Sequence, residues 1–230
     1  MTSLEEKLGY EFRDSELLRT ALRHRSFSRE GREQTADNER LEFLGDAVLG
    51  FLVSERLLQL FPDLAEGPLT KIKARLVSAD GLFEVAAAIR LGDQVELGRT
   101  EEHNGGRSKK SILADAVEAL IAAAYLDGGS AAAGSVVDRL ILRPERVAEA
   151  KQNLAVDNAK STLQEILQAR QGPLPEYRVL SEEGPPHDRV FRVEVLVGEQ
   201  VRVQGQGRTK KEAEQKAARE ALRRIEPALG

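Results

Sequence analysis

The sequence predicts an all-α N-terminal domain followed by a small α+β domain with the element order α-β-β-β-α. Two observations lead to this fold class. Apolar residues recur at helical spacing through the first two thirds of the chain, whereas three segments near the C-terminus alternate apolar and polar residues with a period of two. A polar stretch separates the two regions, so we expect domains at residues 1–148 and 158–227, joined by a linker at 149–157.

The N-terminal region begins with two short predicted helices within residues 1–36. Ser3 and Glu6 have the spacing of a capping box for the first helix, and Asp14 is placed to cap the second. A long helix follows the N-cap candidate Asp37 and contains no proline before Pro62.

Further helices are expected after this long one. A proline in its first turn begins the next helix, which is followed by a mobile loop with three cations at 103–110. Pro144 either kinks the last helix of the domain or begins a new one. The predicted ranges are 69–90, 111–121 and 130–150.

The C-terminal region has a helix at each end and three strands between them. A capping box of Thr209 and Glu212 opens the last helix, and Gly198 with Glu199 indicates a tight turn between the last two strands. The predicted helices are 159–170 and 209–225, and the predicted strands are 177–182, 189–197 and 200–206.

Composition excludes several classes of protein. The chain of 230 residues contains no cysteine, which excludes disulfides and thiolate metal sites and fits the reducing cytoplasm. Four charged residues within the first eleven positions leave no apolar core for a signal peptide. The longest apolar run, residues 119–126, is too short to cross a bilayer, so we expect no membrane partner.

Charge is distributed unevenly along the chain. The net charge is −4, but residues 158–230 hold 13 Lys and Arg against 11 Asp and Glu, a net of +2. Residues 1–157 hold 21 Lys and Arg against 27 Asp and Glu, a net of −6. Because binding to a polyanion needs a local basic surface, this asymmetry predicts that the C-terminal domain grips a polyanion while the N-terminal domain concentrates cations.

The long helix carries three acids on one face. At about 100° per residue, Glu39, Glu42 and Asp46 fall within an arc of roughly 60°. The rest of the helix is apolar nearly all round, which is typical of a buried helix. Like charges one turn apart repel each other, so a bound cation is the simplest reason to keep them.

A second helix has the same feature, because Asp115 and Glu118 lie one turn apart in an aliphatic run. If the two helices face each other, Glu42, Asp46, Asp115 and Glu118 converge. Oxygen-only ligands select hard cations, so we predict Mg²⁺, with Mn²⁺ as a substitute, and no organic cofactor. Mg²⁺ held by few carboxylates keeps water ligands that can attack phosphorus. The alternative is two solvated acidic stripes.

These two acidic stretches resemble the motifs of the bacterial ribonuclease III family. Residues 38–49 (NERLEFLGDAVL) are similar to its signature, and residues 113–129 (LADAVEALIAAAYLDGG) are similar to its second acidic motif. The resemblance covers essentially the whole chain. It implies a helical endonuclease domain, a double-stranded-RNA-binding domain, and Mg²⁺-dependent cutting of double-stranded RNA, as in processing of ribosomal RNA precursors and other structured transcripts.

The resemblance also assigns roles to residues. Asp46 and Glu118 are the expected catalytic residues within the four-acid metal site, and Glu39 and Glu66 are auxiliary acids near the cleavage site. The products would carry 5′-phosphate and 3′-hydroxyl ends with a short 3′ overhang. One acidic cluster cuts one strand, so we expect a two-fold homodimer, with Phe43 beside the acidic face as an interface anchor.

The first residues of the last helix predict a contact with RNA. Lys210 and Lys211 occupy its first turn, where the helix dipole disfavours cations and free backbone N–H groups favour phosphate. By resemblance to double-stranded-RNA-binding domains, further contacts come from the domain's first helix and from the loop between its first two strands. Those contacts are Thr162, Gln164, Glu165 and His187. The chain departs from the broader domain family at Glu214, where a third lysine is common, and Lys216 is a partial substitute.

Two rival functions remain at the level of sequence. A di-iron carboxylate protein would pair glutamate with histidine three residues on, and no histidine lies near either acidic motif. A non-catalytic double-stranded-RNA-binding protein could keep the same domains, although all four acids are present.

Overall fold

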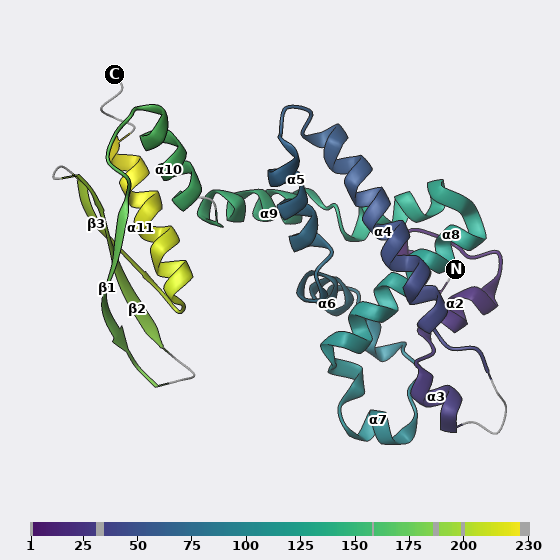
Figure 1. Cartoon of the computed structure of the whole chain (residues 1–230). Coiled ribbons are helices and arrows are strands. Elements are labelled where there is room, and N and C mark those ends of the chain that lie inside the picture. Colours follow the sequence, from purple (N-terminus) through teal and green to yellow (C-terminus); the bar gives the residue numbers. More distant parts are fainter. Residues whose placement is uncertain (1, 31–34, 158, 186–188, 199–200, 226–230) are drawn as a thin grey trace. The chain divides into compact units, whose positions relative to one another are not determined.

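A computed structural model describes residues 2–30, 35–157, 159–185, 189–198 and 201–225, and of residues 153–157 only the backbone. The chain divides into two compact units, Met1–Ala150 and Lys151–Gly230. Figure 1 shows the helical unit and the smaller unit with its three-stranded sheet. The finer boundaries 1–148, 149–157 and 158–227 stay predictions, and α9 runs through the predicted linker.

The first unit is all-α in its described residues, apart from an isolated backbone bridge between Arg23 and Glu96. Two 3-10 turns, Leu91–Asp93 and Gly106–Ser108, join some of the helices. The helices are α1 (Ser3–Leu8), α2 (Ser15–Leu22), α3 (Arg25–Glu30), α4 (Glu39–Leu60), α5 (Glu66–Leu76), α6 (Ala79–Ala88), α7 (Arg99–His103), α8 (Lys110–Leu140) and α9 (Pro144–Asp157).

Several predicted helix limits are wrong for local reasons. The capping box of α1 lies one residue earlier, because the Thr2 hydroxyl accepts from the Glu5 N–H at 3.2 Å and the Glu5 carboxylate accepts from the Thr2 N–H. A third short helix, α3, follows α2. The single helix predicted at 69–90 is two helices, because the Ser78 hydroxyl caps a new one through the Gly81 N–H at 3.1 Å.

Other predicted helix ends are confirmed or refined. Asp14 caps α2. Pro144 begins α9 instead of kinking α8. At α4 the N-cap is Asn38, and the predicted cap Asp37 accepts a hydrogen bond from the Glu39 N–H at 3.2 Å.

Helix α8 forms the centre of the first unit, and α4 packs along it (Figure 1). Most residues between Ile112 and Ala124 are buried. By length and composition α8 could cross a membrane, but 56 % of its most apolar window is buried inside the protein. Its helical path also breaks at Gly129, which has φ 76°. These features are those of a core helix, most of whose residues between Ile112 and Ala124 are covered by protein.

The second unit contains the predicted α-β-β-β-α order. Helices α10 (Ala159–Ala169) and α11 (Lys210–Ile225) enclose, in sequence, β1 (Glu176–Glu183), β2 (Val190–Val197) and β3 (Val201–Gly207). The sheet is antiparallel in the order β1-β2-β3, with an irregularity between Val179 and Ser181. Buried aliphatic side chains from both helices and from β2 and β3 form its core.

Candidate metal centre and RNA-binding surface

Gly45 brings the two acidic helices together. A Cβ atom on this residue of α4 would lie 2.1 Å from the backbone carbonyl oxygen of Glu118 on α8. Only glycine permits such a close approach of one backbone to another. Because Gly45 lies between Glu42 and Asp46, the crossing point places the acids of α4 beside those of α8. The sequence signal for this contact was a glycine in a helix interior, and sequence reasoning did not use it.

Three of the four predicted metal ligands converge at this crossing. One carboxylate oxygen from each of Glu42, Asp115 and Glu118 lies within 4.8 Å of the others, and all three side chains are partly buried. We call these three residues the acidic cluster. Asp46 is exposed and lies outside the cluster, although its charge acts on both Glu42 and Glu118.

The electrostatics of the acidic cluster favour the binding of a cation. Burial raises the pKa of Glu118 to about 7, and Asp46, Asp115 and Glu42 add to the shift. Burial also raises the pKa of Glu42, with the charge of Asp115 as the next cause. Burial likewise raises the pKa of Asp115, which the charge of His24 opposes. Oxygen donors this close together fit a hard divalent ion.

The auxiliary acids lie outside the acidic cluster. Glu39 is exposed at the start of α4 and pairs with Arg25 at 2.9 Å. Glu66 is exposed at the start of α5 and accepts from the Thr70 hydroxyl at 2.8 Å. Nearby, the Nδ1 atom of His24 lies 2.8 Å from the Ser26 hydroxyl.

The predicted mobile basic loop at 103–110 is instead held in place. Arg107 pairs with Glu102 at 2.7 Å and donates to two backbone carbonyl groups. Lys109 pairs with Glu101 at 3.0 Å, and Lys110 pairs with Asp80. These cations are therefore neutralised within the first unit.

Phe43 belongs to an apolar surface on α4. The side chains of Phe43, Phe51 and Leu58 are 83 %, 62 % and 61 % exposed. The prediction that this helix is buried nearly all round is thus wrong for the single chain. A groove of about 730 Å³ borders Phe43, with Leu44, Ala36 and Leu126 among its lining residues. A large exposed aromatic beside an apolar groove is typical of a protein interface.

The two lysines predicted to clamp phosphate lie in the first turn of α11. Lys210 and Lys211 are exposed there. The Thr209 hydroxyl caps the helix by accepting from the Glu212 N–H at 3.1 Å. The Glu212 carboxylate accepts from the Arg208 N–H at 2.8 Å. In a capping box the donor would be the N–H of Thr209, one residue later.

The other predicted RNA contacts lie mainly on α10. Thr162, Gln164 and Glu165 are exposed, while Leu163 between them is buried in the core. The helix therefore offers a polar face beside its packed one. His187 lies outside the described residues.

Glu214 has a partner within the second unit. Its carboxylate pairs with Lys160 at 2.6 Å, and the Lys160 ammonium lies 4.3 Å from the centre of the Tyr177 ring. The nearby Lys216 pairs with Glu212 at 2.6 Å. The negative charge that replaces the expected third lysine is thus neutralised by a lysine of α10, and Lys216 is not a free substitute for it.

Comparisons with known proteins agree with both units. A family model described as Ribonuclease-III-like matches residues 14–145. A second model, described as Double-stranded RNA binding motif, matches residues 159–225. This chain belongs to the ribonuclease III family.

Relatives in the family match nearly the full length of the chain. Ribonuclease 3 of Solibacter usitatus is 47 % identical over 96 % of this chain and 86 % of its own length. Ribonuclease 3 of Geobacter sulfurreducens is 46 % identical over 97 % and 90 %. The family and the acidic cluster together indicate a divalent metal.

A solved structure is similar to the helical unit. The nuclease domain of ribonuclease III from Campylobacter jejuni is 45 % identical and has a TM-score of 0.56, covering 60 % of this chain and 91 % of that one. A second structure of that Campylobacter domain is described as having structural flexibility in a region involved in dimer formation.

Proposed function

We propose that the chain is a Mg²⁺-dependent endoribonuclease that hydrolyses phosphodiester bonds of double-stranded RNA. The observation that carries this proposal is the convergence of Glu42, Asp115 and Glu118 where α4 and α8 cross. Three carboxylates in partly buried positions repel one another, and a divalent cation removes that repulsion. The products are 5′-phosphate and 3′-hydroxyl ends with a short 3′ overhang.

The acids of the two helices have distinct tasks. Glu42, Asp115 and Glu118 would hold the cation, and the exposed Asp46 would supply a further carboxylate oxygen. Asp46 and Glu118 are the residues whose loss stops the chemistry. When bound, Mg²⁺ activates water as a nucleophile and stabilises negative charge on the phosphodiester oxygens. Glu39 and Glu66 act as auxiliary acids near the cleavage site.

The second unit supplies affinity for the duplex. Lys210 and Lys211 contact phosphates across the major groove, because they combine positive charge with the free N–H groups of a helix start. Thr162, Gln164 and Glu165 face a minor groove, as in the domain family that this unit matches. His187 is proposed to reach a second minor groove.

A second copy of the chain completes the enzyme. One acidic cluster cuts one strand, so cutting both strands needs two clusters. The exposed Phe43 and its neighbouring groove are suited to a self-complementary two-fold contact, in which each copy supplies both features. The protein is proposed to act in the cytoplasm on precursors of ribosomal RNA and on other structured transcripts.

Cleavage of a defined RNA duplex tests the proposal. The full chain should cut with Mg²⁺ and not with a chelator. Glu118→Gln should bind the duplex as tightly in Mg²⁺ but turn over at least about 10²-fold more slowly, because it loses one charged ligand. Glu55→Gln is the matched control, since Glu55 is an exposed acid of α4 outside the cluster.

Two outcomes would contradict the proposal in different ways. Turnover of Glu118→Gln near that of the unaltered chain would reject the assignment of Glu118. Tight binding of duplex RNA without cleavage in either Mg²⁺ or Mn²⁺ would favour the non-catalytic RNA-binding alternative.

A further inference from the structure

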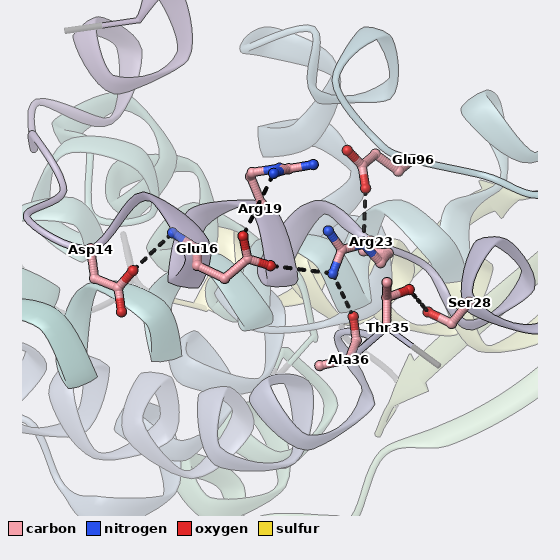
Figure 2. A network of polar contacts seen from close by, with 8 residues as sticks. All are labelled: Asp14, Glu16, Arg19, Arg23, Ser28, Thr35, Ala36 and Glu96. Atoms are coloured by element: carbon pink, nitrogen blue, oxygen red, sulfur yellow. Dashed lines mark hydrogen bonds and ion pairs between the residues drawn. The ribbon is translucent and has the colours of Figure 1, made fainter. Parts of the chain in front are cut away.

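Arg23 is a buried arginine at the end of α2, close to the start of α4. Its side chain is only 4 % exposed. Its Nε donates to the Glu96 carboxylate at 3.0 Å, and its NH1 group donates to the carbonyl oxygen of Ala36 at 2.9 Å. The Glu16 carboxylate lies 3.5 Å from the same NH1 group. Figure 2 shows that these partners belong to three separate segments of the chain.

The backbone of Arg23 joins the same segments. Its carbonyl oxygen accepts from the Asn38 N–H at 2.9 Å, and it bridges to Glu96. The Asn38 side chain is buried and donates to the Ala21 carbonyl oxygen at 3.4 Å. The guanidinium and the backbone of Arg23 therefore hold both ends of the segment 36–38, which leads directly into α4.

The segment 36–38, which Arg23 holds, lies about one helical turn before Glu42 of the acidic cluster. The Glu42 N–H donates to the Asn38 carbonyl oxygen at 2.8 Å, which makes Glu42 part of the first turn of α4. The first turn of a helix frays most easily, because its N–H groups lack helical partners. Asp115 and Glu118 lie beyond the first turn of α8, which begins at Lys110. Loosening of residues 36–38 would thus act first on Glu42.

We infer that Arg23 is a positioning residue for the acidic cluster, acting through Glu42. The inference rests on the proposed function, since it takes the cluster to be the cation site. The side-chain partners of Arg23 are protein groups, Glu96, Ala36 and Glu16. Arg23 fixes the start of α4 so that the Glu42 carboxylate meets those of Asp115 and Glu118. Residues that orient metal ligands from outside the ligand set commonly change metal affinity by about 10–100-fold when they are altered.

Binding of Mn²⁺ alone, measured by electron paramagnetic resonance on the full chain, tests this inference. Arg23→Ala should weaken Mn²⁺ binding about 10-fold. Arg19→Ala is the matched control, because Arg19 shares the partner Glu16 but is 61 % exposed (Figure 2). Its Mn²⁺ affinity should stay within about twofold of the unaltered chain, as expected for an exposed ion pair.

A double-mutant cycle separates positioning from general damage. If Arg23 acts through Glu42, then Arg23→Ala should change Mn²⁺ affinity by less than about twofold in a Glu42→Gln background. About 20 mM guanidinium, far below denaturing concentrations, should restore binding to Arg23→Ala by filling the vacated site, and should leave Arg19→Ala unchanged. A general loss of folding would instead lower Mn²⁺ affinity by a similar factor in both backgrounds.

Clear results would overturn the inference. The inference is wrong if Arg23→Ala binds Mn²⁺ as tightly as the unaltered chain. It is also wrong if Arg23→Ala lowers Mn²⁺ affinity by the same factor in the Glu42→Gln background as in the unaltered chain. If Arg23→Ala does not fold, Glu96→Ala removes one anchor and should weaken Mn²⁺ binding about threefold; unchanged binding then refutes the inference. A chain that binds Mn²⁺ but never cuts duplex RNA refutes the proposed function instead, and leaves this comparison valid.

Discussion

Replacing Gly45 by alanine should separate the two acidic helices. The new Cβ would lie 2.1 Å from the Glu118 carbonyl oxygen, whereas real Cβ atoms essentially never come closer than 3.0 Å. The helices must therefore move apart by about 1 Å at this point. The obstructing atom belongs to the backbone of α8 and cannot rotate away as a side chain could.

The expected loss of stability follows from two opposing effects. Overpacking a tight contact costs about 3 kcal/mol when the neighbour is rigid. Alanine recovers about 1 kcal/mol, because it is the better helix former. The net loss is about 2 kcal/mol, which corresponds to a fall in Tm of about 4–8 °C for a unit of this size.

The expected loss of activity is larger than the loss of stability. Displacing the carboxylates of α4 from those of α8 by about 1 Å should slow cleavage by about 10²-fold. Calorimetry and single-turnover cleavage of duplex RNA measure the two effects on the same preparation.

Gly50→Ala is the matched control on the same helix. Its Cβ would meet only the flexible end of Lys73, at 3.5 Å. This variant should keep full activity and gain up to about 1 kcal/mol in stability. Equal Tm and turnover in Gly45→Ala and the unaltered chain would refute the argument that the backbone contact sets the position of the acids.

Three further predictions concern charge, assembly and RNA contact. Because burial raises the pKa of Glu118 to about 7, the metal-free fold binds more protons than the unfolded chain between about pH 4.5 and 7. Its Tm in a chelator should therefore fall as pH rises through that window, and Glu118→Gln should flatten the profile. Phe43→Ala should weaken the dimer by about 2–4 kcal/mol in sedimentation, as loss of a central aromatic anchor does; unchanged mass would exclude Phe43 from the interface. Changing Lys210 or Lys211 to Ala should weaken binding to all duplex sequences alike and reduce the salt slope by about one each, while Lys216→Ala, which removes an ion pair with Glu212, should change binding little.

The sequence by itself determined most of the helices and strands and the chemistry of the acids. Helical and two-residue periodicities are local properties, so the predicted α-β-β-β-α order agrees with the structure. The identity of Glu42, Asp115 and Glu118 as oxygen donors is likewise a property of single residues. The spacing of acids along each helix placed them on one face, but their convergence remained conditional on the two helices facing each other.

Only the tertiary structure decided how close the helices come and which apolar residues stay exposed. The contact at Gly45 joins residues 73 positions apart in the chain, and the pairing of Arg23 with Glu96 spans a similar separation. Periodicity carries no information on such distances. It also cannot distinguish an apolar face that packs on α8 from one that remains open, as at Phe51. The exposure of Asp46 outside the acidic cluster was undetermined for the same reason, because a helix pattern fixes the face of a residue but not what covers it.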